Sequence, residues 1–226
     1  ILAAGQADMI GMCRALVADP SWPNKAERGA VSDIRRCVSC NRCWGAAVGM
    51  RRLVCAVNAA AGSELDFPAI TRSDRRKKIV VVGGGPGGME AARTAALRGH
   101  DVTLIEKRDV LGGKMAHAEA YADFHDIAYA VTYLRAQVAR LGVTVKLKTE
   151  AHIDELLAIN ADAIVVATGA RIVAPTLPGD GSVPLQAFGK ASGGSHVVVM
   201  DEDGYFWGSA AAEAALQVAR KRGQTL

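Results

Sequence analysis

Four cysteines lie close together in the chain and have the type and spacing of metal ligands. Cys37, Cys40, Cys43 and Cys55 follow the pattern C-x2-C-x2-C-x11-C. Thiolates at such short spacings bind an iron–sulfur cluster or a zinc ion. Zinc sites usually come as two separated pairs, so three closely spaced cysteines and a distant fourth favour a [4Fe-4S] cluster. Two disulfides, or four cysteines that are close by chance, are the other interpretations.

A second group of residues predicts a dinucleotide site. The pattern G-x-G-x-x-G follows an apolar run over 78–82 and opens an alanine-rich segment from 86 to 98. The first motif glycine permits a tight turn, the second lets the backbone approach a pyrophosphate, and the third lets helix and strand pack closely. The helix N-terminus would face the phosphates with its amides. The alternative is a glycine turn without a ligand, but the strand and helix around the motif favour a site. Its residues are Gly83, Gly84, Gly85, Pro86, Gly87 and Gly88.

An acidic residue stands where the ribose of such a nucleotide would lie. Glu106 ends the apolar run 102–105, 18 residues beyond Gly88. Its carboxylate is placed to accept hydrogen bonds from free ribose hydroxyls, so an unphosphorylated nucleotide is expected. Lys107 either contacts the adenine edge or is solvated. FAD and ADP are not separated by this motif, because both present the same ADP-ribose.

Periodic segments predict the elements that position these residues. Apolar strands over 78–82, 102–105 and 163–167 alternate with helices over 86–98 and 123–141, which is typical of an α/β fold with a parallel, Rossmann-like sheet. The helix 123–141 carries an apolar stripe, and Tyr129 and Tyr133 lie off its centre. Residues 143–147 alternate in polarity and predict a half-buried strand, followed by a short helix around 153–159.

The bulk properties exclude several classes of protein. The 226 residues carry a net charge of +4, and the basic residues are scattered except for the run 72–78, which we interpret as a solvated linker. The sequence has no basic stripe with interleaved aromatic residues, which is the pattern that would predict nucleic acid binding. No apolar run reaches the length of a membrane span and no signal peptide is apparent, and the cysteine usage favours a reducing cytoplasm. The chain begins at Ile1 without a Met, so we expect a fragment of a longer polypeptide.

The two ends of the chain look like parts of further domains. Residues 8–14 predict a buried strand in which Cys13 is a packing residue, and 23–29 a helical turn that ends at Gly29. Residues 196–200 and 209–222 predict the strand and helix of a second nucleotide fold. Asp201, Asp203 and Phe206 stand where its three motif glycines would be. Two carboxylates repel a pyrophosphate and a phenyl ring prevents close packing, so this turn is predicted to lack a phosphate site.

Several stretches together resemble a known family. They are ADMIGMCRALVADPSWPNKAERG, DIRRCVSCNRCW, CAVNAAAGSE and the apolar run that ends in Ala167-Thr168-Gly169. They resemble the C-terminal part of the trimethylamine dehydrogenase and 2,4-dienoyl-CoA reductase family, the iron–sulfur, old-yellow-enzyme-like flavoproteins. The reductase branch has three residues between its second and third cysteines. This chain has two, as in the trimethylamine dehydrogenase branch.

The resemblance implies a domain organisation and further site residues. Residues 1–36 would end an FMN-binding (β/α)8 barrel, 37–70 would form the cluster loop and linker, 71–195 an ADP- or FAD-binding domain, and 196–226 a degenerate second nucleotide domain. Arg14 would hold the FMN phosphate, or else form a salt bridge at the barrel rim. Gly113 would pass beside the pyrophosphate, and Thr168 and Gly169 would border the nucleotide. The full-length protein would be a homodimer.

The resemblance also implies an activity. An amine dehydrogenase or demethylase of this branch oxidises a small-molecule amine at FMN in the barrel, and a [4Fe-4S] cluster passes the electrons to an electron-transfer flavoprotein. The catalytic groups would lie in the barrel, so no catalytic residue is predicted in this chain. One alternative is an NAD(P)H-dependent enoate or 2,4-dienoyl-CoA reductase with FAD. Another is a non-catalytic electron-transfer or interaction module that a cluster or zinc ion stabilises.

Overall fold

The computed structural model describes residues 1–67, 69–120 and 125–170, and isolated positions between 208 and 220. Two compact units are distinguished, of which the first comprises residues 1–119 and 125–169 and contains the elements discussed below, except for the last residue of η2. In chain order these are α1 (Arg14–Ala18), α2 (Trp22–Glu27), η1 (Val31–Asp33), α3 (Arg42–Val48), β1 (Lys78–Val82), α4 (Pro86–Leu97), β2 (Asp101–Ile105), η2 (Gly113–Ala120), α5 (His125–Arg140), β3 (Thr144–Lys146), α6 (Ile153–Ala158) and β4 (Ala163–Val166).

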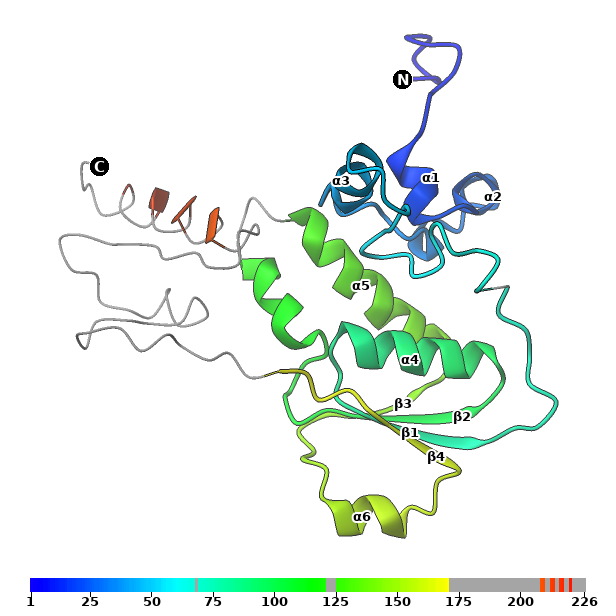
Figure 1. Cartoon of the computed structure of the whole chain (residues 1–226), viewed down its shortest axis with the longest axis vertical. Helices are drawn as coiled ribbons and strands as arrows, with labels where there is room; N and C mark the ends of the chain where they lie inside the picture. Colours follow the sequence, from blue (N-terminus) through cyan, green and yellow to red (C-terminus); the bar gives the residue numbers. More distant parts are fainter. Residues whose placement is uncertain are drawn as a thin grey trace. The chain divides into compact units, whose positions relative to one another are not determined.

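A parallel sheet is the centre of the first unit. Within the described residues it has four strands in the order β3-β2-β1-β4, and each strand is parallel to its neighbour. The chain runs outward from β1 through β2 to β3 and then returns to β4 on the other side of β1 (Figure 1). This reversal makes the carboxyl ends of β1 and β4 a switch point, which is where doubly wound folds bind ligands. The predicted α/β, Rossmann-like fold is confirmed.

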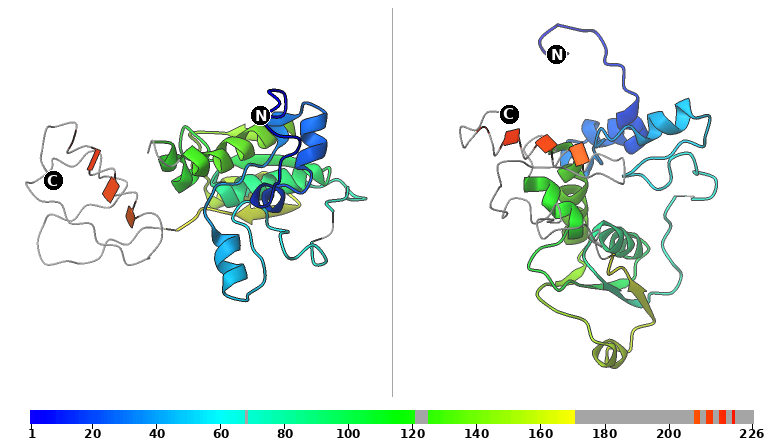
Figure 2. Two further views of the ribbon diagram at one scale, coloured as in Figure 1. Left: turned by 90° about the horizontal axis from the view of Figure 1, so that it is seen from above. Right: turned by 60° about the vertical axis from the view of Figure 1, so that its left-hand side comes forward.

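Helices α4 and α5 lie over one face of the sheet and α6 lies on its other side (Figure 2). The predicted stripe on α5 is confirmed, because Ile127, Val131, Leu134 and Val138 are all buried. Tyr133 is buried with them and belongs to the same hydrophobic core. Helical periodicity alone places Tyr133 off the centre of the stripe. The structure shows that Arg35, from the segment before the cysteines, covers that side of α5.

One charged side chain enters this core. Arg93 of α4 is 7% exposed and forms an ion pair with Glu90, one turn away, with an N–O distance of 2.6 Å. Burial lowers the pKa of the Arg93 guanidinium, but the hydrogen bond and charge of Glu90, together with Tyr133, raise this pKa by more. The pKa therefore lies above its ordinary value and Arg93 stays charged, in keeping with the rule that buried charges are paired.

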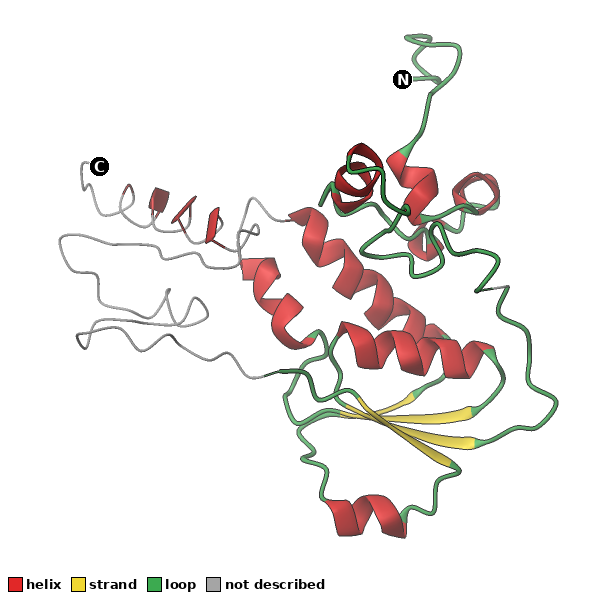
Figure 3. Ribbon diagram, viewed as in Figure 1, coloured by secondary structure: helices red, strands yellow, loops and turns green. Residues whose placement is uncertain are grey.

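The first 36 residues form short helices rather than a strand, as Figure 3 shows in red and green. Residues 8–12 have no regular structure, and Met9 is 81% exposed. The predicted strand over 8–14 is therefore wrong in this structure, because no strand among the described residues pairs with its backbone. The prediction that Cys13 is buried is also wrong, since its side chain is exposed. The helical turn over 23–29 is confirmed by α2 and by Gly29, which has a φ of +67°.

The remaining predictions on the fold have mixed outcomes. The run 72–78 is exposed apart from Ser73, as expected of a solvated linker. The strand 196–200 and the turn that contains Asp201, Asp203 and Phe206 lie outside the described residues. Among the residues that the structure does describe, none of the helices has the length and apolar character to cross a membrane.

Candidate functional site

The glycine loop after β1 is tightly enclosed on the side of the sheet. An added Cβ atom at Gly88 would lie 1.8 Å from the carbonyl oxygen of Gly83, so only a glycine allows α4 to approach β1 this closely. Gly83 has a φ of +106°, and a Cβ atom there would lie 2.3 Å from the carbonyl oxygen of Ala167. The first and third motif glycines therefore have the packing roles expected of a dinucleotide-binding turn.

The same loop is open on its other side. A Cβ atom at Gly87 would meet no atom within 4 Å, and one at Gly85 would meet only the Cα atom of Gly113, at 4.0 Å. Gly85 is the N-cap of the twelve-residue α4, whose first turn contains no acidic residue. Free space above a helix N-terminus that carries unpaired amides fits a pyrophosphate. The Gly113 backbone comes this close because Gly113 has no side chain, since a Cβ atom on it would lie 2.9 Å from the Cα atom of Gly85.

Glu106 lies at the centre of this arrangement. It is buried, and its two carboxylate oxygens accept the backbone N–H groups of Gly84, at 2.6 Å, and Arg108, at 2.9 Å. Each carboxylate oxygen has a second lone pair, so Glu106 can fix the glycine loop and still accept a bond from a ribose hydroxyl. The sequence predicted the second role but not the first.

Thr168 also reaches the loop, and Gly169 follows it with a φ of +80°. The N–H of Ala167 donates to the carbonyl of Val82 at 2.8 Å, which continues the β1–β4 pairing up to the glycine turn. The Cα atom of Thr168 is 3.1 Å from where a Cβ atom of Gly83 would stand. The structure thus brings Gly83, Glu106, Gly113 and Thr168 together at the switch point. Lys107 is exposed.

Two arginines that sequence reasoning missed hold the segment 111–113 beside this loop. Arg135 of α5 donates from Nε to the carbonyl oxygen of Leu111 at 3.0 Å, and Arg108 donates to that of Gly113 at 3.2 Å. The N–H of Gly112 donates to the carbonyl of Gly84 at 2.8 Å. Arg108 could have been found from its position two residues after Glu106. Arg135 could not, because it is distant in sequence from the segment that it holds.

Replacing Glu106 with Gln tests its double role. The amide nitrogen of Gln cannot accept, so one of the two loop N–H groups loses its partner. We expect the free energy of unfolding to fall by about 1–3 kcal/mol. Nucleotide retained through gel filtration should fall with it. The exposed Glu150 offers a matched control as Glu150→Gln, and equal stability of the two variants in urea unfolding would contradict the assignment.

The four cysteines of the predicted metal site lie in the segment from η1 to residue 55, here called the cysteine loop. Cys43 is in the first turn of α3, whereas Cys37, Cys40 and Cys55 are in the irregular stretches before and after that helix. All four thiols are free, with Cys40 exposed and the others partly buried. Ser39 and Asn41 have φ values of +52° and +55°, so the backbone turns back at two positions between Cys37 and Cys43. Non-glycine residues in this region are uncommon and concentrate at functional sites.

The donor chemistry of this loop fits a cluster, whereas its side chains do not converge. Among the described residues, no three Cys, His, Asp or Glu side chains are gathered as metal ligands. Four thiolates repel one another, so such sites form with their metal. Arg35, two residues before Cys37, has a buried Nε atom with no hydrogen-bond partner in the described part of the chain. A spare donor at this position fits a site whose sulfur atoms accept hydrogen bonds.

Arg14 lies apart from the nucleotide loop. Its Nη1 atom donates to the Oδ1 atom of Asn41, which connects α1 to the cysteine loop. Arg14, Asn41 and Trp44 line an open cavity of about 310 Å³. The FMN phosphate assigned to Arg14 by resemblance remains a prediction.

Comparisons with known proteins agree with the site. Residues 77–205 match the family model described as pyridine nucleotide-disulphide oxidoreductase. An NADH oxidase from Thermoanaerobacter brockii is 42% identical over 181 residues, which are 79% of this chain and 28% of that protein. An N,N-dimethylglycine/sarcosine dehydrogenase from Chromohalobacter salexigens is 40% identical over 174 residues, 76% of this chain and 25% of that protein.

A solved structure extends the likeness over the whole chain. Histamine dehydrogenase from Rhizobium sp. 4-9 has a TM-score of 0.81 and 26% identity, over 99% of this chain and 35% of that one. The chain thus spans about a third or less of the length of these proteins. The predicted resemblance is confirmed, since amine dehydrogenases are among the relatives. The chain belongs to the pyridine nucleotide-disulphide oxidoreductase family.

Proposed function

We propose that the chain carries the electron-relay and nucleotide-binding parts of an FMN- and [4Fe-4S]-dependent amine dehydrogenase or demethylase. Cys37, Cys40, Cys43 and Cys55 would hold the cluster, and the loop 83–88 with Glu106 would hold ADP or FAD. Residues 1–36 would end the barrel in which FMN oxidises the amine. A cluster held by four thiolates supplies one-electron transfer, and an electron-transfer flavoprotein would receive the electrons. The full-length enzyme would be a homodimer.

The observation that carries this proposal is the contrast between the two nucleotide turns. In the first, a Cβ atom at Gly88 would lie 1.8 Å from a carbonyl oxygen. In the second, Phe206 stands at the corresponding position, after Asp201 and Asp203. The two carboxylates would repel a pyrophosphate, and the phenyl side chain would prevent close packing of helix and strand. A reductase that takes its electrons from NAD(P)H needs a second nucleotide site to bind that donor. A dehydrogenase that passes its electrons to another protein does not.

The relatives support an amine as the electron donor. The N,N-dimethylglycine/sarcosine dehydrogenase and the histamine dehydrogenase both act on amines by name. The NADH oxidase, at 42% identity, favours a second candidate function, an NAD(P)H-dependent enoate or 2,4-dienoyl-CoA reductase with FAD in the first nucleotide domain. The two candidates differ in what reduces the enzyme.

Anaerobic rapid mixing of the full-length enzyme separates them. One sample receives NADH or NADPH and the other a panel of small methylated amines, and the visible absorbance of flavin and cluster is followed. We expect an amine to bleach both chromophores and neither nicotinamide to do so. Fast bleaching by NADH or NADPH, with no response to any amine, would instead establish the reductase.

A further inference from the structure

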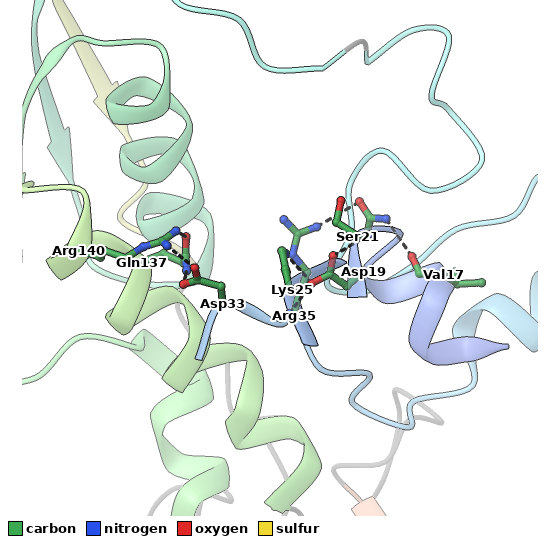
Figure 4. Close-up of polar contacts among 9 residues, drawn as sticks. Val17, Asp19, Ser21, Lys25, Asp33, Arg35, Gln137 and Arg140 are labelled. Carbon is green, nitrogen blue, oxygen red and sulfur yellow. Dashed lines mark hydrogen bonds and ion pairs between the residues drawn. The ribbon is translucent and has the colours of Figure 1, made fainter. Parts of the chain in front are cut away.

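Four polar residues around the base of the cysteine loop form one hydrogen-bonded group, here called the Asp19 network. It consists of Asp19, Lys25, Arg35 and Asn58. The first three of these are labelled in Figure 4. Asp19 is only 4% exposed and Asn58 only 6%. Burial of such groups costs free energy unless their hydrogen bonds are made, so buried groups bonded to several partners indicate a specific structural task. Within the described residues, the Nε atom of Arg35 is the one buried side-chain nitrogen or oxygen atom that lacks a hydrogen-bond partner.

One bond of the network joins the two ends of the loop. Arg35 precedes the first cysteine by two residues, and Asn58 follows the last by three. The Nη1 atom of Arg35 donates to the Oδ1 atom of Asn58 at 3.2 Å. The Nδ2 atom of Asn58 donates to the carbonyl oxygen of Val17 at 2.8 Å. The loop that contains all four thiols is therefore closed at its base and attached to α1.

Asp19 fixes the backbone at the beginning of the loop. Its Oδ2 atom accepts the backbone N–H of Arg35 at 2.8 Å and the ammonium group of Lys25 at 2.6 Å. Its Oδ1 atom accepts the backbone N–H of Ser21 at 3.1 Å. Lys25 therefore neutralises the buried carboxylate, while the turn between α1 and α2 holds Arg35 in place.

The segment that contains Arg35 also packs along α5. The guanidinium carbon of Arg35 lies 5.4 Å from the ring centre of Tyr133, and that of Arg36 lies 4.3 Å from the ring centre of Tyr129. Both distances are in the range of cation–π contacts.

Asp33 extends the same contact along the helix. It accepts hydrogen bonds from Gln137, at 3.3 Å, and from Arg140 (Figure 4). Tyr129, Tyr133, Gln137 and Arg140 are spaced by four, four and three residues and so form one face of α5. That face meets the segment that leads into Cys37.

We propose that Arg35 and Asn58 are positioning residues for the metal centre, and that residues 33–36 hold the cysteine loop at a fixed place on α5 of the nucleotide-binding domain. This inference rests on the proposed function, because it assumes a cluster on the four thiols. The rate of one-electron transfer falls steeply with the distance between donor and acceptor, so a relay centre must be held close to both. The Asp19 network provides that rigidity from one side and the face of α5 provides it from the other.

The test uses the full-length holoenzyme and measures how fast an iron chelator removes the cluster. Arg35→Met and Asn58→Ala should each speed cluster loss by about 10- to 100-fold, as changes next to metal ligands do. Arg28→Met, at an exposed arginine outside the network, should stay within about twofold of the parent. The Arg35→Met/Asn58→Ala double variant should lose its cluster more slowly than the product of the two single effects predicts, because the bond that the two residues share is removed only once.

A second readout distinguishes positioning from general stability. The electron paramagnetic resonance spectrum and midpoint potential of the reduced cluster should change in Arg35→Met and Asn58→Ala, while thermal unfolding of the nucleotide-binding domain should not. Asn58→Ser, a milder change, should show the same trend if Asn58→Ala does not fold. A parent enzyme without iron and sulfide would overturn the proposed function itself. A parent with a cluster, and variants with unchanged loss rates and spectra, would overturn only the positioning roles.

Discussion

Replacing Cys40 with Ser is expected to reduce the iron and sulfide of the full-length protein from about four of each per chain to almost none. A serine hydroxyl remains protonated where a thiol ionises, so it is a poor replacement for a thiolate ligand. Export of electrons to an acceptor should be lost together with the cluster. Iron and sulfide analysis and visible absorbance of the anaerobically purified variant measure this effect.

The nucleotide-binding domain should be unaffected by this change. Cys40 is an exposed residue on the loop before α3 and is absent from the hydrophobic core of the sheet. Circular dichroism and nucleotide content should therefore match those of the parent. Cys13→Ser is the matched control, because Cys13 is also exposed but lies outside the four-cysteine motif. A Cys40→Ser protein with the parent's iron content would show that Cys40 is not an essential ligand.

Replacing Gly88 with Ala is expected to destabilise the nucleotide-binding domain by about 3 kcal/mol or more, the upper part of the range for overpacked sites. The new methyl group would lie 1.8 Å from the carbonyl oxygen of Gly83, which is backbone and cannot rotate away. Either β1 and α4 must separate or the loop must rearrange, and both changes disturb the pyrophosphate cradle. Urea unfolding and the amount of nucleotide that co-purifies measure the two consequences.

Gly87→Ala is the matched substitution one residue earlier. A Cβ atom at Gly87 meets nothing within 4 Å, and the residue lies in the first turn of α4. Alanine favours a helix over glycine by up to about 1 kcal/mol, so this variant should be at least as stable as the parent. If Gly88→Ala were as stable as Gly87→Ala, the close packing assigned to the third motif glycine would be wrong.

The geometry of the candidate nucleotide site was predictable because its information is local. The glycine spacing, the apolar runs on either side and the acid at Glu106 all lie within one strand–helix–strand unit. Parallel pairing of β1 with β2 brings the carboxyl ends of both strands to the same edge of the sheet, so Glu106 must lie near Gly84. The apolar stripe on α5 was predictable for the same reason, since helical periodicity depends only on neighbouring turns.

Predictions near the N-terminus were less successful because strands need partners. The apolar residues at 8–13 have the composition of a strand, but in this structure the segment has no regular structure and Cys13 is exposed. Composition describes what a segment can form, and pairing with another strand decides whether it forms.

The sequence by itself determined which residues are candidates for the chemistry: which thiols are spaced like metal ligands and which glycines are spaced like those of a pyrophosphate-binding turn. Only the tertiary structure decided how these sites are held. Arg35 meets Asn58 23 residues away, and Asp33 meets Arg140 107 residues away. Tyr133 belongs to the core although it lies off the apolar stripe, because the segment before Cys37 covers it. Such contacts are set by the packing of elements distant in the chain, and no local spacing encodes them.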